Sequence, residues 1–199
     1  MGTVTQKPVA ETVRHRVEHT RPNMFFRVDD FDGDAGEVGS VLRCLVGEGE
    51  LVRVSRGLYW RGQKTRFGMT HPSTLGAAVA VGGPGSGPSG VAAAHFLGLS
   101  TQVPAVVEVG VPGQVPEPMC GVRFQSRPYV RYEYCLTPLE VAVLEVLGNP
   151  HIVEVSWPLV EEHIRLLVIR GMLRVTVLAT LTAMEPQEIV QKRWVAISL

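Results

Sequence analysis

Basic side chains gather in the short segment between residues 51 and 66. The segment carries Arg53, Arg56, Arg61, Lys64 and Arg66 and no acidic residue. The stretch before it has the opposite character, with Asp29, Asp30, Asp32, Asp34, Glu37, Glu48 and Glu50 against Arg43 alone. A local basic stripe can bind phosphate even though the formal net charge of the whole chain is zero. The segment is therefore a candidate phosphate-binding surface, and a solvated hairpin is the simpler alternative.

Regular spacing of apolar residues indicates the elements that position these side chains. We expect a helix over about residues 36–48, because its apolar residues recur at the spacing of one helix face. Residues 51–54 and 58–61 alternate as two strands around Ser55-Arg56-Gly57, which is typical of a hairpin. Upstream we expect a loose arm over residues 1–8, a helix over 9–20, a strand over Phe25–Val28 and a second helix capped by Asp29 or Asp30.

This order of elements predicts a winged helix-turn-helix over residues 8–66. The helix over 36–48 would be the recognition helix and the hairpin would be the wing. Residues 62–73 are polar and are expected to be a linker.

A second domain is expected over residues 73–199, which makes the whole chain an α+β protein. It would combine a small sheet with several helices. Strands are expected over 106–111, 122–125 and 127–134, and helices over 91–97, 138–147, 157–170, 173–183 and 185–193; residues 74–81 read as either a helix or a strand.

Arginine and tyrosine alternate in a second basic segment of the chain. It contains Arg123, Arg127 and Arg131 together with Tyr129, Tyr132 and Tyr134. Such interleaving can bind nucleic acid or a partner through charge and stacking. One face of a packed strand explains the same pattern equally well, and both interpretations stay open.

Residues Gly85–Gly90 match the spacing G-x-G-x-x-G of dinucleotide-binding loops. Glu108 follows about twenty residues later, roughly where an acid that binds ribose would lie. Pro88 within the loop, the short helix after it and the lack of a continuing strand–helix–strand series favour a flexible turn instead. A helix start at Ser89 could still hold an anion.

The remaining residue types point away from catalysis, cofactors and membranes. Cys44, Cys120 and Cys135 fit no zinc motif and are expected to be buried free thiols. The histidines have no ligand spacing, so we expect no metal and no enzyme activity. No signal core and no apolar run of the roughly 20 residues that a membrane span needs are present, so a cytoplasmic protein is expected.

Three segments carry a family resemblance. These are RGLYW (56–60), SGVAAAHFLGLSTQVPAVVEVGVPG (89–113) and LTPLEVAVLEVL (136–147), in this order. The chain resembles the AbiEi-like antitoxins of type IV toxin–antitoxin (abortive infection) systems, and related winged-helix proteins without an assigned function, over roughly residues 10–195.

The resemblance implies a transcriptional regulator that binds double-stranded DNA at its own promoter. It also implies a C-terminal domain that counteracts a nucleotidyltransferase-like toxin encoded nearby. By position, the DNA-facing residues would be Ser40 and Arg43 on the recognition helix and Arg53, Arg56 and Arg61 in the wing. Two alternatives remain: a protein-interaction module that has lost DNA binding, and a nucleotide-binding enzyme that uses Gly85–Gly90.

Overall fold

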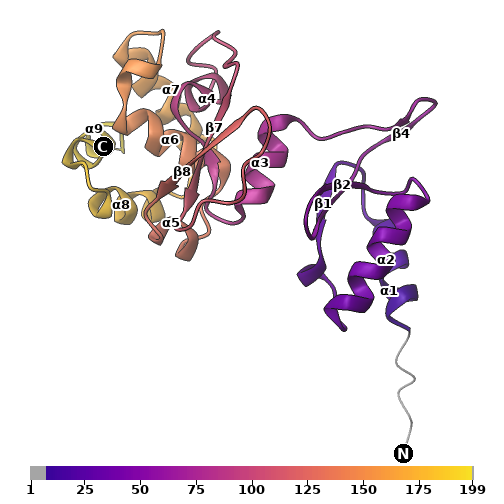
Figure 1. Ribbon diagram of the computed structural model, residues 1–199. Helices are drawn as coiled ribbons and strands as arrows, with labels where there is room; N and C mark the ends of the chain where they lie inside the picture. Colours follow the sequence, from indigo (N-terminus) through magenta and orange to yellow (C-terminus); the bar gives the residue numbers. More distant parts are fainter. Residues whose placement is uncertain (1–7, 199) are drawn as a thin grey trace, which may run out of the picture. The chain divides into compact units, whose positions relative to one another are not determined.

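The computed structural model describes residues 8–198, and its chain divides into two compact units (Figure 1). Unit 1 spans Met1–Ser73 and unit 2 spans Thr74–Leu199. The arm expected over residues 1–8 lies outside the described residues except for Pro8. The mixed α+β class predicted from the sequence is confirmed, with a small sheet and several helices in unit 2.

Unit 1 consists of two helices, a three-stranded sheet and a small hairpin. Its elements are α1 (Val9–His19), β1 (Met24–Arg27), a 3-10 turn (Val28–Asp30), α2 (Ala35–Gly47), β2 (Val52–Ser55), β3 (Leu58–Arg61), β4 (Lys64–Thr65) and β5 (Gly68–Met69). The sheet has the order β1-β3-β2, and both pairings are antiparallel. The helices expected over 9–20 and 36–48, the first strand and the β2–β3 hairpin are therefore confirmed.

The core of unit 1 lies between the two helices and the sheet. Val13 and Val17 of α1 meet Leu42 and Leu45 of α2, and Tyr59 of β3 packs against the same cluster. These helical residues recur three or four positions apart, so that each helix turns one apolar face inward. The opposite face of α2 is left to solvent.

The expectation of a helix capped by Asp29 or Asp30 is wrong. Residues 28–30 form only a 3-10 turn, in which the Asp30 carboxylate accepts a hydrogen bond from the Arg27 backbone N–H at 2.6 Å. Asp34 instead caps the next helix, accepting from the backbone N–H groups of Gly36 and Glu37 at 2.9 and 3.0 Å. Several aspartates in a row offer several caps, and the sequence does not reveal which one the chain uses.

The segment 62–73, expected to be a linker, contains the short β4–β5 hairpin. Thr65 Oγ1 donates to the Gly68 carbonyl at 2.7 Å, and Gly68 has a φ of +108°. The indole Nε1 of Trp60 donates to the carbonyl of Thr70 at 2.8 Å, which ties the end of this segment to the sheet.

Unit 2 places a three-stranded sheet among seven helices of the described chain. Its elements are α3 (Thr74–Gly82), β6 (Gly87–Pro88), α4 (Gly90–Phe96), β7 (Val107–Pro112), β8 (Val122–Arg127), α5 (Val130–Glu133), α6 (Pro138–Gly148), a 3-10 turn (Pro150–Ile152), α7 (Trp157–Ile169), α8 (Val175–Met184) and α9 (Glu188–Ser198). Strand β7 is central; it pairs antiparallel with β6 and parallel with β8.

Two apolar clusters hold unit 2 together. The smaller one packs Ala78 of α3 against Val109 and Val111 of β7. The larger one surrounds α6, whose apolar residues are almost completely buried, and includes Trp194 of α9. Helix α6 begins with a capping box in which Thr137 and Glu140 satisfy each other's backbone N–H groups.

The expectation of a strand over residues 127–134 is wrong. Strand β8 ends at Arg127, and Val130–Glu133 form a single helical turn. Pro128 follows β8 directly and removes a backbone donor, so the chain leaves the sheet there. Arginines that alternate on a strand would share a face, whereas here Arg131 turns into the interior.

Among the described residues, no helix has the length and the apolar character needed to cross a membrane.

Gly85 lies beneath the backbone of residues 131–132, which makes its substitution a sharp test of unit 2 packing. Its φ is +76°, and an added Cβ would overlap the Arg131 carbonyl and approach Tyr132 N to 2.8 Å. We expect Gly85→Ala to lower the free energy of unfolding by about 3 kcal/mol in urea titrations.

Gly121→Ala is the matched control, because Gly121 has a φ of +73° but open space around its Cβ position. It should cost only about 1 kcal/mol. If the two variants lost the same free energy of unfolding, the loss at Gly85 would come from its backbone conformation and not from its contact with residues 131–132.

Candidate functional site

Helix α2 presents Ser40 and Arg43 on its solvent face. Val38, Leu42 and Leu45 are buried on the opposite side, so the spacing of the helix fixes this orientation. The Arg43 guanidinium donates to Ser40 Oγ at 2.9 Å. Both side chains are exposed, which leaves most of the Arg43 donors free for a partner.

The β2–β3 hairpin presents Arg53 and Arg56 to solvent. Gly57, with a φ of +72°, makes the turn beside Arg56. Arg53 makes one long hydrogen bond, from Nε to the Ser55 carbonyl at 3.4 Å. In the part of the chain that the structure describes, no hydrogen bond or ion pair holds the Arg56 guanidinium, so both arginines can contact a ligand.

The other basic residues of the segment 51–66 are engaged within unit 1. Arg61 lies at the end of β3 away from the hairpin turn, and its guanidinium donates to the Glu18 carbonyl at 3.0 Å. Lys64 pairs with Glu50. Arg66 lies over the Phe67 ring, with Cζ 4.6 Å from the ring centroid. The five basic residues that are adjacent in sequence are thus not one cluster in space.

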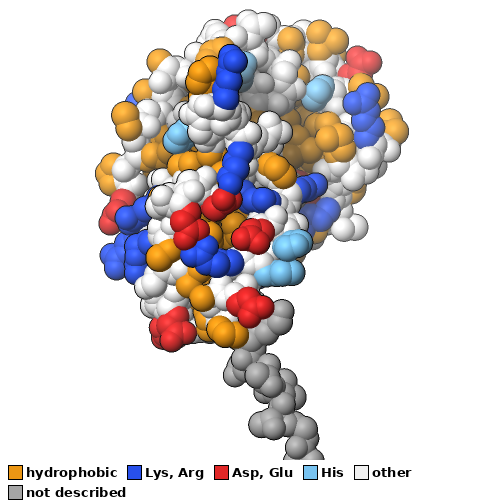
Figure 2. Space-filling model, turned by 90° about the vertical axis from the view of Figure 1, so that its right-hand side faces the viewer, with side chains coloured by type: hydrophobic (Ala, Val, Ile, Leu, Met, Phe, Trp, Pro, Cys, Tyr) orange, Lys and Arg blue, Asp and Glu red, His pale blue; other side chains and the backbone are white. Residues whose placement is uncertain are grey.

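Acidic side chains lie among the basic ones on the surface. On the face of the molecule shown in Figure 2, arginine and lysine side chains alternate with aspartate and glutamate. Asp29, Asp30 and Asp32 are exposed just before α2 begins. Their charges repel phosphate, so the beginning of α2 is less suited to an anionic ligand than the middle of α2 and the hairpin.

The structure separates Arg123, Arg127 and Arg131. Arg123 is exposed on β8 and pairs with Glu108 at 2.8 Å. Arg127 and Arg131 turn into unit 2, where the side chain of Arg131 is only 3% exposed. Sequence reasoning placed these three on one surface because it expected a strand where α5 lies.

Two tyrosines of the same segment remain on the surface. The rings of Tyr129 and Tyr132 stack with centroids 5.2 Å apart, and both side chains are exposed. Tyr134 packs against the larger core cluster instead. The three tyrosines therefore do not form one row on which successive bases could stack.

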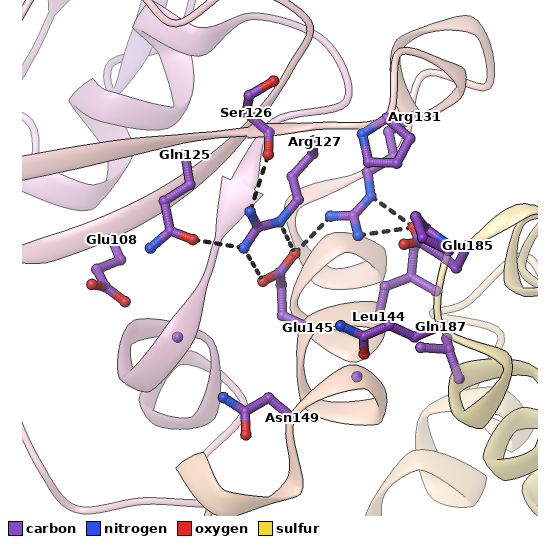
Figure 3. Close-up of a pocket in the computed structure, with 15 residues that line it drawn as sticks. Glu108, Gln125, Ser126, Arg127, Arg131, Leu144, Glu145, Asn149, Glu185 and Gln187 are labelled. Carbon is purple, nitrogen blue, oxygen red and sulfur yellow. Dashed lines mark hydrogen bonds and ion pairs between the residues drawn. The ribbon is translucent and has the colours of Figure 1, made fainter.

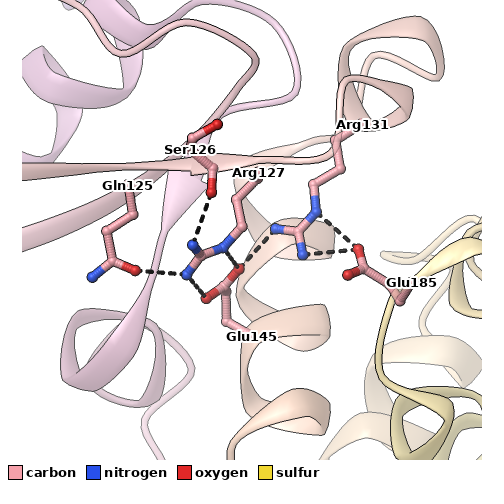
Figure 4. Close-up of polar contacts among 6 residues, drawn as sticks. All are labelled: Gln125, Ser126, Arg127, Arg131, Glu145 and Glu185. Atoms are coloured by element: carbon pink, nitrogen blue, oxygen red, sulfur yellow. Dashed lines mark hydrogen bonds and ion pairs between the residues drawn. The ribbon is translucent and has the colours of Figure 1, made fainter.

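Glu145 of α6 is the centre of a buried ion network (Figure 4). Its carboxylate accepts two hydrogen bonds from Arg127, from Nε and Nη2, both at 2.7 Å. It also accepts one from Arg131 Nη1 at 2.7 Å. Arg131 continues to Glu185, with Nε and Nη2 at 3.0 and 2.8 Å from Oε1. Gln125 accepts a further bond from Arg127 at 2.8 Å.

The network determines the charge of its members. Burial raises the pKa of the Glu145 carboxyl, but hydrogen bonds and positive charge from Arg127 and Arg131 outweigh burial and leave this pKa below its usual value. The hydrogen bond to Glu145 raises the pKa of Arg127, against the effect of burial. The pair is therefore ionised throughout the neutral pH range.

A cavity of about 450 Å³ opens beside the network (Figure 3). In that view Glu108 lies to the left of the Arg127–Glu145 pair and Asn149 lies below it. Arg131 lies on the right. The guanidinium groups of Arg127 and Arg131 are already paired with carboxylates. An anionic ligand would therefore have to displace one of these carboxylates. Side-chain amides from Gln125, Asn149 and Gln187 also line the cavity, and Gln125 already accepts a hydrogen bond from Arg127.

Glu140 is a second buried carboxylate that sequence reasoning missed, and its partner Arg174 is partly exposed. Arg174 Nη2 lies 2.6 Å from Glu140 Oε2, and the glutamate side chain is 1% exposed. Burial raises the pKa of the Glu140 carboxyl, but hydrogen bonds from Arg174 and Thr137 outweigh burial and leave this pKa below its usual value. Glutamates inside the apolar run 136–147 were the signal for both pairs, since such a position requires a buried partner.

The glycine-rich loop is buried and does not form an open phosphate cradle. Residues 85–89 are all buried, and an added Cβ on Gly87 would lie 2.6 Å from the Cβ of Val141. Ser89 is the residue before α4, but its side chain makes no cap hydrogen bond. The hydroxyls of Ser86 and Ser89 are buried without a hydrogen-bond partner among the described residues.

The cysteines are exposed free thiols, so the expectation of buried ones is wrong. Cys44, for example, falls on the solvent face of α2. Within residues 8–198, no three histidine, cysteine, aspartate or glutamate side chains come together in a way that could hold a metal ion.

Comparison with known proteins adds little to this description. No protein-family model matches the chain, and no curated protein matches its sequence. Among solved structures, the crystal structure of the RV2827C protein from Mycobacterium tuberculosis is similar over 96% of this chain and 77% of that chain, with 16% identity and a TM-score of 0.42. This likeness is too low to carry an argument.

The ion network predicts a specific dependence of stability on pH. We expect Glu145→Gln to lower the free energy of unfolding by about 3 kcal/mol near neutral pH, because it leaves Arg131 buried with one charge partner fewer. A carboxyl with a lowered pKa stabilises the fold above its unfolded pKa of about 4.3 and loses this effect as the pH falls further. The difference between the variant and the wild type should therefore shrink from about pH 7 to about pH 3.

Urea unfolding followed by tryptophan fluorescence measures this effect, since Trp157 and Trp194 report on unit 2. Glu188→Gln is the control, because this residue is exposed and, among the described residues, its one ion pair is with Lys192 at 3.6 Å. It should change stability by less than about 0.5 kcal/mol. A Glu145→Gln variant as stable as the control, or one whose deficit stays constant with pH, contradicts the role of the network.

Proposed function

We propose that unit 1 is a winged helix-turn-helix that binds double-stranded DNA, and that the chain is a transcriptional regulator. The sheet order β1-β3-β2 supports this assignment most strongly. In a winged helix, the strand after the first helix pairs with the second strand of the wing, and the recognition helix precedes the wing. The order α1, β1, α2, β2, β3 has this connection, with a 3-10 turn in the place of the middle helix.

The exposed side chains suggest separate roles for the helix and the hairpin on this surface. Helix α2 would enter the major groove with Ser40 and Arg43 toward the base edges. Arg53 and Arg56 would contact phosphates on either side of the groove. Arg61 is left out of this surface because it donates to the Glu18 carbonyl at the other end of the strand. Binding at a promoter would act by excluding polymerase.

Removing the two hairpin arginines tests the phosphate contacts. We expect Arg53→Ala with Arg56→Ala to weaken DNA binding for all sequences and to flatten the plot of log affinity against log salt by about 1 to 2 units. The measurement is fluorescence anisotropy with a labelled duplex from the region upstream of the gene and with a scrambled duplex, at low and at physiological salt.

The matched control removes two positive charges elsewhere. Arg21 lies beyond the end of β1 that is remote from the hairpin turn, and Lys192 lies on α9 of unit 2. Arg21→Ala with Lys192→Ala should leave affinity and salt slope nearly unchanged. If both double variants behave like the wild type, the hairpin does not contact DNA.

For unit 2 we propose the antitoxin role that the AbiEi-like resemblance implies. The segments 89–113 and 136–147 that carry this resemblance form the centre of unit 2, from α4 through β7 to α6. The toxin would be a nucleotidyltransferase-like protein encoded nearby, and the antitoxic effect does not require a stable complex.

Co-expression tests this role. We expect the product of a neighbouring gene to arrest growth when expressed alone and to be harmless when the whole chain is present. The variant Arg53→Ala with Arg56→Ala should still protect if toxin and antitoxin are expressed from foreign promoters, because protection belongs to unit 2. A neighbour that is harmless alone, or that stays toxic, excludes the antitoxin assignment.

One observation favours a second candidate function. The exposed acids Asp29, Asp30, Asp32 and Glu37 surround the beginning of α2, the end that usually approaches bases. A protein-interaction module with a basic partner fits this charge better than DNA does. Equal binding of native and scrambled duplexes that vanishes at physiological salt would support this alternative.

A further inference from the structure

Helix α7 carries an apolar stripe on its solvent side. Val160, Ile164 and Leu167 are buried against the core of unit 2. On the outer face, Leu159 is 52% exposed, Leu166 42% and Ile169 79%. Apolar side chains at this helical spacing and this exposure are typical of a surface that a partner covers.

Two unpaired charges flank the centre of this stripe symmetrically. Glu162 lies four residues before Leu166 and Arg170 lies four residues after it, so both border the same face. Both are exposed, and in the described chain neither makes an ion pair. The neighbouring charges are used within the chain: Arg165 lies 3.6 Å from Glu161 and donates to the Ala196 carbonyl at 3.1 Å.

Opposite charges at equal distances from a central residue are self-complementary under a two-fold axis. If two copies of the helix run antiparallel and cross at Leu166, Glu162 of each copy faces Arg170 of the other. His163 then faces Ile169 of the second copy, and the two Leu166 side chains meet at the axis. A partner with another sequence would not require this symmetry of charge.

We propose that α7 is a homodimerisation helix that pairs antiparallel with α7 of a second copy of this chain. Two salt bridges between Glu162 and Arg170 fix the register, and the apolar stripe supplies the attraction. A helix of 13 residues is about 20 Å long. The interface is therefore smaller than the roughly 800 Å² per partner of a standard complex, and the dimer is expected to be weak. This pairing does not depend on whether unit 1 binds DNA.

Sedimentation velocity of the whole chain over a wide range of concentrations tests the pairing. The wild type should pass from monomer to dimer as the concentration rises, and Leu166→Glu should raise the dissociation constant at least about tenfold. Lys192→Glu, an exposed charge reversal on α9, should leave it unchanged. Circular dichroism and thermal unfolding verify that every variant is folded.

A charge exchange distinguishes the proposed register from other dimers. Glu162→Arg and Arg170→Glu should each raise the dissociation constant about tenfold, because each places like charges together twice. The double variant Glu162→Arg with Arg170→Glu should restore the wild-type value. An equimolar mixture of the two single variants should form a heterodimer, since every facing pair is then of opposite sign.

Three results would overturn the proposal. The first is a wild type that stays monomeric at the highest concentration reached. The second is a dimer that Leu166→Glu does not weaken, which places the interface elsewhere. The third is a double variant as weak as the single ones, which excludes the pairing of Glu162 with Arg170 and leaves the stripe to a different protein.

Discussion

A single buried carboxylate, Glu145, connects the sheet of unit 2 to its helices. It binds Arg127 at the end of β8 and Arg131 in α5, and Arg131 extends the connection to Glu185 after α8. Glu145 and Arg131 are almost completely removed from water, so removing one partner would leave the other charge buried without compensation. The network thereby links β8, α5, α6 and the α8–α9 turn, which the apolar clusters of unit 2 also pack together.

The network also determines where the chain can meet other molecules. It withdraws Arg127 and Arg131 from the surface, so the second basic segment cannot serve as a broad nucleic-acid platform. The arginines of unit 1 that remain free, above all Arg53 and Arg56, then become the main candidates for phosphate contacts. Helix α7 faces outward with the apolar stripe around Leu166, which suits a protein contact.

Local patterns predicted most of the elements, because apolar spacing and caps act over a few residues. The helix α2, the β2–β3 hairpin and the helix over 138–147 were all visible in this way. Each of the two misassigned segments could adopt two local conformations of similar stability. Either Asp30 or Asp34 could cap a helix, and the chain uses Asp34. After Arg127 the chain could continue as a strand or turn away, and Pro128 favours the turn. The buried ion pairs join residues up to 54 positions apart, from Arg131 to Glu185, and no local pattern specifies such partners.

The most direct test of DNA binding by unit 1 is a proton–nitrogen NMR titration of the labelled chain with a duplex from its own upstream region. The proposed surface predicts that amide signals of residues 40–44 and 53–57 shift most, and that the shifts weaken as salt is added. Shifts confined to unit 2, or a spectrum that the duplex leaves unchanged, would contradict the assignment of unit 1 as the DNA-binding part of this protein.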